Sequence, residues 1–189
     1  MNTAAAVSAA VVSADVRYPL GLIQPLTLAD GRRLVVRPVL PQDDAAEQAF
    51  VMALSAASRY RRFHVGLRAL PPSTLAQLTH VDHQSHVALV AQLEGDDDEP
   101  VIVADARYVK LGDDRAEFAI AVADAWQGQG LGRRLLCMLA RYAARRGIHT
   151  LHGDVLADNA PMIAMLRRLG GELVVRADEP GLLVATVVL

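Results

Sequence analysis

Short runs of apolar residues, separated by polar turns, cover the chain from residue 33 to residue 189. Runs of this length, bounded by Pro, Gly or Asp, predict strands. The expected strands are residues 33–39, 86–93, 101–109, 115–123, 149–156, 172–176 and 182–189. The polar stretches 94–100 and 178–181 would join two pairs of them as hairpins, and we interpret the acidic run in 94–100 as a solvated loop tip.

Apolar residues spaced three and four apart predict helices between these strands. The expected helices are residues 43–54, 58–63, 72–79, 130–146 and 159–169. Ser58 would cap the second of them, and Gly147 would end the fourth. The apolar stripe of that fourth helix is formed by Leu131, Leu135, Met138, Leu139 and Tyr142.

The order of these elements predicts a mixed α/β (α+β) sheet rather than a regular βαβ repeat. A chain of 189 residues with 52% hydrophobic and 21% charged residues suits one domain with an apolar core. Residues 1–25 show no sustained period, so we expect a flexible tail there and a single domain over residues 26–189.

Bulk properties narrow the class of protein. A net charge of −2 does not favour a nucleic-acid binder, and no apolar run reaches the ~18 residues of a membrane span. The Ala/Val-rich N-terminus has no Lys or Arg before its apolar stretch, so we predict a cytoplasmic tail and not a signal peptide. The single cysteine, Cys137, fits a reducing compartment, and we interpret it as a packing residue. The oligomeric state stays open, with a homodimer among the alternatives.

The most informative segment is residues 116–132, where a predicted strand runs into a glycine-rich turn that opens a helix. Backbone N–H groups in such a turn, together with the positive end of the helix, suit a pyrophosphate. Side chains at Gly128, Gly130 or Gly132 would hinder close approach of the backbone. The loop lacks the Gly-Lys-Ser/Thr of a P-loop, and its glycines do not follow G-x-G-x-x-G. A purely structural turn remains the alternative.

Residues 127–132, QGQGLG, resemble the Q/R-x-x-G-x-G/A signature of GNAT N-acetyltransferases, which binds the pyrophosphate of acetyl-CoA. The similarity extends from about residue 34 to residue 189 and includes VLADN at residues 155–159. It implies a GNAT fold, with a mostly antiparallel sheet of about seven strands flanked by helices. It also implies acetyl-CoA (coenzyme A) as co-substrate and no metal.

A narrower resemblance is to the Pat-type protein lysine acetyltransferases. Four stretches carry it, namely SRYRRF at 58–63, LTHVD at 78–82, AEFA at 116–119 and RRLG at 167–170. This resemblance implies a lysine acceptor, and acyl-CoA synthetases are the typical targets of the group. An acetyltransferase for small amines and a non-catalytic acyl-CoA-binding sensor remain the alternatives.

The family resemblance assigns cofactor contacts residue by residue. The loop would hold the pyrophosphate, backbone groups of the preceding strand would pair with the pantetheine arm, and Asn159 would contact CoA. Arg133 and Arg134 either reach CoA phosphates or are exposed helix arginines, and Asn159 is otherwise a plain helix cap. The predicted cofactor-binding residues are Ile120, Ala121, Val122, Gln127, Gly128, Gln129, Gly130, Leu131, Gly132, Arg133, Arg134 and Asn159.

Glu117 is the candidate catalytic base, since the Pat-type group places a catalytic Glu at this point. A lysine amine, with a pKa near ~10.4, arrives protonated and must lose a proton before it attacks a thioester. By strand alternation Glu117 lies opposite Phe118, Ile120 and Val122, among small alanines. The alternative is an exposed glutamate at a strand end.

Two further features concern the leaving group and a possible metal. Many GNAT enzymes have a Tyr, thought to protonate the leaving thiolate, at the position of Leu166 here, so the usual acid is absent. His80, Asp82, His83 and His86 follow no zinc spacing, and we expect surface or acceptor-cleft histidines instead of a metal site.

Overall fold

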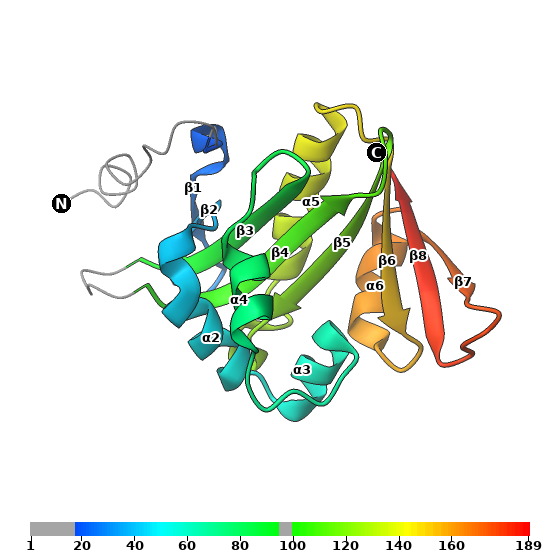
Figure 1. Cartoon of the computed structure of the whole chain (residues 1–189), viewed down its shortest axis with the longest axis horizontal. Coiled ribbons are helices and arrows are strands. Elements are labelled where there is room, and N and C mark those ends of the chain that lie inside the picture. The colour runs from blue at the N-terminus through cyan, green and yellow to red at the C-terminus, as the bar shows by residue number, and fades with distance from the viewer. Residues whose placement is uncertain (1–17, 95–99) are drawn as a thin grey trace.

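The computed structural model describes residues 18–94 and 100–189, which form one twisted sheet with helices on both faces (Figure 1). Eight strands lie in the order β1-β2-β3-β4-β5-β6-β8-β7. All neighbouring strands are antiparallel except β5 and β6, which confirms the predicted mixed, mostly antiparallel sheet. The strands are β1 (Gln24–Thr27), β2 (Arg33–Pro38), β3 (His86–Leu93), β4 (Ile102–Lys110), β5 (Arg115–Val122), β6 (Thr150–Leu156), β7 (Glu172–Val175) and β8 (Leu182–Val188).

The eighth strand is β1, which the sequence pattern did not reveal. It has only four residues, three of them exposed, and Pro25 interrupts it, so neither length nor alternation marks it. Proline is tolerated because β1 is an edge strand that pairs only with β2. The expectation of irregular structure up to residue 25 was therefore wrong at its end. Residues 1–17 and 95–99, where the tail and the acidic loop tip were predicted, lie outside the described residues.

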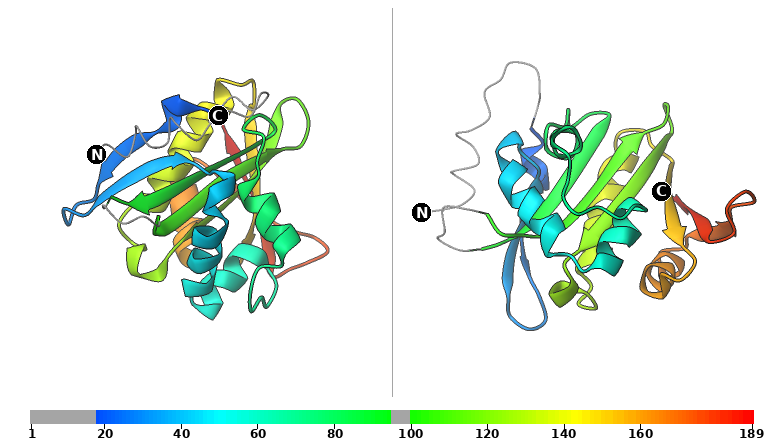
Figure 2. Two further views of the ribbon diagram at one scale, coloured as in Figure 1. Left: turned by 60° about the vertical axis from the view of Figure 1, so that its left-hand side comes forward. Right: turned by 60° about the horizontal axis from the view of Figure 1, so that its bottom comes forward.

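Five α-helices cover the sheet in the described part of the chain. Figures 1 and 2 show α2, α3 and α4 on one face of the sheet and α5 and α6 behind it. A short 3₁₀ turn, η3 (Asp124–Trp126), follows β5. The helices are α2 (Asp44–Ala53), α3 (Ala56–Phe63), α4 (Pro72–Thr79), α5 (Leu131–Ala144) and α6 (Ala160–Arg168).

The start of α3 differs from the prediction. Ser55, and not Ser58, is the N-cap, and its Oγ accepts a hydrogen bond from the N–H of Ser58 at 3.2 Å. Ser58 lies inside the helix, where its hydroxyl donates to Asp124 at 2.8 Å. The partner is 66 residues away in the chain, so local sequence could not show that Ser58 has another role.

The sheet separates two apolar clusters, and β5 contributes to both. Phe118 packs with residues of α5 and α6 on one face, and Ile120 and Val122 lie against the same cluster. Ala121 belongs to the cluster under α2 and α4 on the other face. The alternation predicted for this strand is therefore confirmed.

β5 and β6 are paired over a short distance only. Their parallel register covers three positions and ends at Glu117 opposite His152. Beyond this point the two strands diverge, with α3 below the opening in Figure 1. The Phe118 ring packs against Gly153 at the point of divergence, where a Cβ on Gly153 would lie 2.7 Å from the ring.

Candidate active site

A cleft of about 630 Å³ occupies the opening between β5 and β6. Its walls come from β5, the glycine-rich loop with the start of α5, the end of β6, α6 and α3. Segments far apart in the sequence thus meet where the sheet opens. The predicted site residues that line the cleft are Glu117, Ile120, Ala121, Val122, Gln127, Gly128, Gly130, Leu131, Gly132, Arg133 and Asn159.

Gln129 and Arg134 were predicted to bind the cofactor but do not line the cleft. The side-chain Oε1 of Gln129 accepts a hydrogen bond from Arg32 at 2.5 Å, and that guanidinium also stacks on Trp126 with its Cζ 3.7 Å from the ring centroid. Arg134 reaches the carbonyl oxygen of Thr27 at 3.5 Å. Both side chains face the hairpin of β1 and β2, which the sequence pattern had not revealed.

The glycine-rich loop has the backbone shape that an anion site needs. Gly128 and Gly130 have φ angles of 74° and 79°, in the left-handed region that L side chains rarely adopt. No side chain caps the start of α5, so its first N–H groups are available at the edge of the cleft. Gly132 lies where α5 packs on β5, and a Cβ there would make ordinary van der Waals contacts of 3.5 Å with Ile120 and Val122.

Hydrogen bonds tie the loop to α3. The carboxylate of Asp124 accepts from the Ser55 N–H at 2.9 Å and from the hydroxyls of Ser55 and Ser58, both at 2.8 Å. Burial acts to raise the pKa of Asp124, but these hydrogen bonds outweigh it and hold the pKa below its usual value. Gln127 donates to Ser58 at 3.1 Å and to the carbonyl oxygen of Val122 at 2.9 Å. Its amide therefore fixes the loop, a role that the sequence did not suggest.

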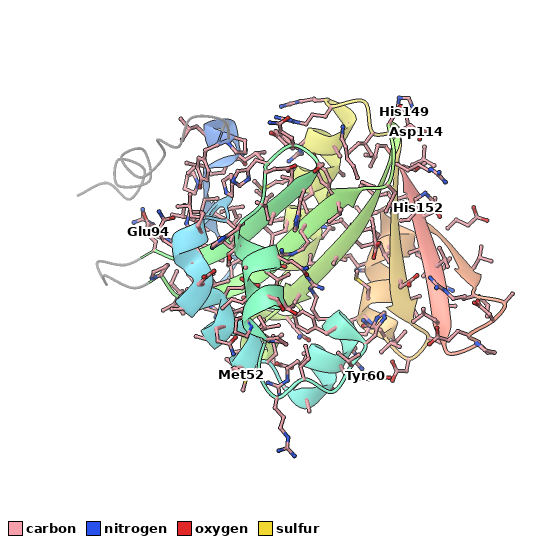
Figure 3. The ribbon with its side chains drawn as sticks, viewed as in Figure 1. Met52, Tyr60, Glu94, Asp114, His149 and His152 are labelled. Atoms are coloured by element: carbon pink, nitrogen blue, oxygen red, sulfur yellow. The ribbon has the colours of Figure 1, made fainter. Side chains whose placement is uncertain are left out.

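Glu117 lies at the last position where β5 pairs with β6, between Val109 and His152. Figure 3 shows His152 near the upper end of β6, where the two strands are still together. The side chain of Glu117 is exposed to the cleft, and within residues 18–94 and 100–189 it makes no hydrogen bond or ion pair. An accessible carboxylate without a partner can accept a proton from a substrate.

Residues of α3 form the wall that the predicted site did not include. Arg61, Arg62, Phe63 and His64 line the cleft together with Ser58. The stretch 58–63 carries the Pat-type resemblance, but apart from Ser58 as a helix cap no side chain in it was assigned a role, and none was assigned to the site. Missed charged residues of the lining also include Asp154 on β6, which no motif marked, and Arg168 on α6, which lies in the stretch RRLG that carries the Pat-type resemblance.

A buried charge cluster fixes this wall to the sheet. The side chain of Arg62, only 12% exposed, lies 3.6 Å from Asp105, which also pairs with Arg107. Glu47 lies 3.6 Å from Arg107 and is 1% exposed. Burial and the nearby Asp105 raise the pKa of Glu47 to about 8, against the opposing effect of Arg107 and Arg62. The position of α3 thus depends on charges at the centre of the sheet.

Comparisons with known proteins identify the family of this chain. Residues 58–171 match the Acetyltransferase (GNAT) family. The chain is also 33% identical over 145 residues to an acetyltransferase of Pseudomonas aeruginosa, an alignment that covers 76% of this chain and 77% of that relative. The chain belongs to the GNAT acetyltransferase family. It is therefore an N-acetyltransferase, and enzymes of this family use acetyl-CoA as co-substrate.

The Pat-type resemblance is also confirmed. The GNAT domain of S. lividans PAT superposes with a TM-score of 0.83 at 30% identity, and the alignment covers 92% of this chain and all of that domain. An acetyltransferase Pat of Mycolicibacterium smegmatis is 33% identical over 148 residues. That alignment covers 77% of this chain but 43% of the relative, so the chain spans less than half of that protein's length.

Two positions acquire a clear structural role within the GNAT fold. Leu166, which replaces the usual Tyr, is fully buried on α6 and does not line the cleft. Asn159 lines the cleft and also caps α6, because its Oδ1 accepts from the N–H of Met162 at 3.4 Å. The cap is therefore present, while the predicted contact with CoA stays a prediction.

The histidine cluster is dispersed around the sheet. Asp82 accepts hydrogen bonds from the N–H groups of Gln84, Ser85 and His86, and His83 is buried edge-on against Tyr18. None of the four cluster residues lines the cleft. Of the two expectations, surface histidines therefore fits better, although it holds fully only for His80, because His83 is buried and His86 half-buried. Across residues 18–94 and 100–189, no three His, Cys, Asp or Glu side chains form a group that could hold a metal ion. The absence of a metal cofactor stays a prediction.

Burial disfavours the charged form of His86. It lowers the pKa of this histidine to about 4, and the adjacent Arg107 acts in the same direction. Cys137, half-buried on α5, lies along an apolar groove outside the cleft, in agreement with a packing role.

Proposed function

We propose that this protein transfers an acetyl group from acetyl-CoA directly to the side-chain amine of a lysine in another protein. The observation that carries the proposal is the unpaired carboxylate of Glu117 in a cleft that also contains the uncapped start of α5. One end of the cleft suits a phosphate group, and the other offers a proton acceptor. Family membership and the Pat-type relatives support the transfer of an acetyl group from acetyl-CoA to an amine.

Acetyl-CoA would bind along β5. The first N–H groups of α5 would hold the pyrophosphate, and Arg133 lines the cleft beside them. Past Glu117, β5 has no strand partner on the β6 side. Residues 120–122 line the cleft there, where an extended arm with amide groups could hydrogen-bond to the strand. In this proposal Gln129 and Arg134 hold the loop in place, and the other predicted residues bind acetyl-CoA.

The chemistry needs one base. Glu117 would take a proton from the lysine ammonium, and the free amine would attack the thioester carbon. The carbon–sulfur bond then breaks, and CoA leaves as a thiolate. The acetylated nitrogen loses its extra proton to solvent, and the thiolate takes a proton from solvent. Leu166 can supply no proton, so the proposal includes no acid from the protein at that position.

The charges of the cleft argue for a protein acceptor over a small cationic amine. A pocket walled by acidic residues would favour the small amine. Among the described residues, only Glu117 and Asp154 contribute carboxylates to the cleft, and Asp154 is paired with Arg176. Four arginines line the same cleft. A lysine of an acyl-CoA synthetase is the acceptor that the Pat-type resemblance suggests.

Location and assembly stay predictions. Within the described residues no helix is both long and apolar enough to cross a bilayer. The cytoplasmic location, the absence of nucleic-acid and membrane partners, and a homodimer would each need separate measurement.

The test is intact-mass analysis of candidate acyl-CoA synthetases incubated with acetyl-CoA and this protein. We expect the addition of acetyl groups, which peptide mapping would place on lysine side chains. An acceptor whose lysines have been reductively methylated should gain none. Acetylation of small amines only, with all protein acceptors unchanged, would contradict the proposal.

A further inference from the structure

The segment that contains the α3 wall of the cleft is strongly basic. From residue 55 to residue 81 there is no Asp or Glu, in a chain whose net charge is −2. This segment runs from the N-cap of α3 to the end of α4. Its basic residues are Arg59, Arg61, Arg62, His64, Arg68 and His80.

Two of these arginines have structural partners. Arg59 donates to the carbonyl oxygens of Val51 and Met52, near the end of α2, at 3.4 and 3.3 Å. Arg62 is held by Asp105 in the buried charge cluster. Both guanidinium groups are therefore bound by other groups of the fold, and each fixes α3 in place.

Arg61 lies between them in sequence but has no such partner. It is half-buried and lines the cleft, and in the described part of the chain it makes no hydrogen bond or ion pair. The carboxylates of the cleft do not neutralise it, because Asp154 is bound to Arg176 and Glu117 has no ion pair. An arginine in this position can bind a carboxylate of the substrate through two parallel hydrogen bonds.

The sheet itself separates the arginines of α3 from Arg133 and Arg168, the cleft arginines of α5 and α6. Phe63 of α3 packs in the same cluster as Ala121, and Ala121 shares its face of β5 with Glu117. Arg133 and Arg168 come from α5 and α6, which pack on the opposite face. Figure 3 shows α3, marked by Tyr60, below the opening between β5 and β6. Arg61 therefore stands on the side of the proposed base.

We propose that Arg61 binds a carboxylate of the acceptor, so that the enzyme prefers a lysine with Asp or Glu close to it in the acceptor protein. This inference rests on the proposed lysine acetyltransferase function. It adds the chemistry of the acceptor segment, which is an acidic stretch of polypeptide. The competing assignment for the same charge is a contact with a phosphate of CoA, since Ser58, one turn before Arg61, bonds to the loop residue Gln127; the KM for acetyl-CoA distinguishes the two.

The experiment compares lysine peptides that carry Asp or Glu beside the lysine with matched peptides that carry Asn or Gln. We expect wild type to acetylate the acidic peptides with a kcat/KM about fivefold higher, the size of one partly exposed charge pair. Arg61→Gln should abolish the preference, Arg61→Glu should reverse it, and Arg61→Lys should retain most of it. The preference should weaken at high salt.

Arg145→Gln is the matched control, because this exposed arginine after the end of α5 does not line the cleft. It should leave the peptide preference unchanged, and all variants should keep the wild-type KM for acetyl-CoA. Arg61→Gln and Arg61→Lys are mild changes, so they keep the test decisive if Arg61→Glu fails to fold.

The possible failures are distinct. A raised KM for acetyl-CoA with the peptide preference intact would assign Arg61 to the cofactor and overturn the inference. Equal rates of wild type on acidic and neutral peptides would also overturn it, while leaving lysine acetylation in place. No acetyl-lysine with any peptide or protein acceptor would instead contradict the proposed function.

Discussion

Replacing Gly153 with Ala tests whether the split between β5 and β6 depends on the packing of Phe118. A Cβ at Gly153 would lie 2.7 and 2.8 Å from two atoms of the Phe118 ring, which is 4% exposed. Ordinary contacts begin near 3.4 Å. The ring would have to move by about half an ångström or more in a close-packed region, and overpacking of this kind costs about 1–3 kcal/mol.

Thermal unfolding followed by circular dichroism measures this cost. For a domain of this size about 1 kcal/mol lowers Tm by roughly 2–4 °C, so Gly153→Ala should lower Tm by about 2–12 °C. Gly181→Ala is the matched control, since no atom lies within 4 Å of its added Cβ and its φ is not positive. We expect that variant to be neutral or stabilised by up to about 1 kcal/mol.

A second substitution identifies the ring as the cause. Phe118→Leu in the Gly153→Ala background should cost less than the sum of the two single changes, because the smaller side chain makes room for the new methyl group. Phe118 also lines the cleft next to Glu117, so kcat/KM of Gly153→Ala should fall as well. A wild-type Tm for Gly153→Ala, or strictly additive costs in the double variant, would refute the reasoning.

The remaining predictions concern the base, the loop and acid stability. Glu117→Gln should lower kcat/KM at neutral pH by about 10²–10⁴, and this loss should shrink as the pH approaches the pKa of the amine. The control, Glu172→Gln at an exposed position on β7, should have no effect. A wild-type rate for Glu117→Gln would exclude Glu117 as the base. Gly130→Val should weaken CoA binding at least about tenfold by calorimetry, whereas Gly147→Val, at a similar positive φ beyond the other end of α5 and away from the cleft, should bind CoA normally. Burial acts to raise the pKa of Asp82, but its hydrogen bonds hold that pKa at about 2, against 3.8 in the unfolded chain. The Asp82 carboxylate therefore stabilises the folded state above pH 3.8, and this contribution is lost as pH falls towards 2. Acid unfolding of Asp82→Asn should therefore show a smaller loss of stability over that interval, and an unchanged slope would contradict the assignment.

Local patterns were sufficient for most of the fold. The seven strands and five helices that the periodicity indicated are present, with ends shifted by a few residues at most. The glycine-rich loop was predictable because the φ angles of Gly128 and Gly130 are set within a few residues. The face of Glu117 followed from strand alternation, which needs only the neighbouring residues.

Other features depended on contacts between distant parts of the chain. β1 is too short and too polar to be marked by periodicity, and it exists because β2 offers it an edge. That hairpin in turn places Arg32 against Gln129, a separation of 97 residues, and so removes Gln129 from the cleft wall. No pattern in residues 127–132 carries this information.

The cleft was the part that tertiary structure decided. The sequence by itself determined which residues the loop and β5 would present, because backbone conformation and alternation are local properties. It did not determine which side of α3 would face them, since the rotation of a short helix about its axis depends on what it packs against. Here the Ser55 and Ser58 bonds to Asp124 and the Arg62 pair with Asp105 hold that helix, and only their combined geometry leaves Arg61 facing the cleft.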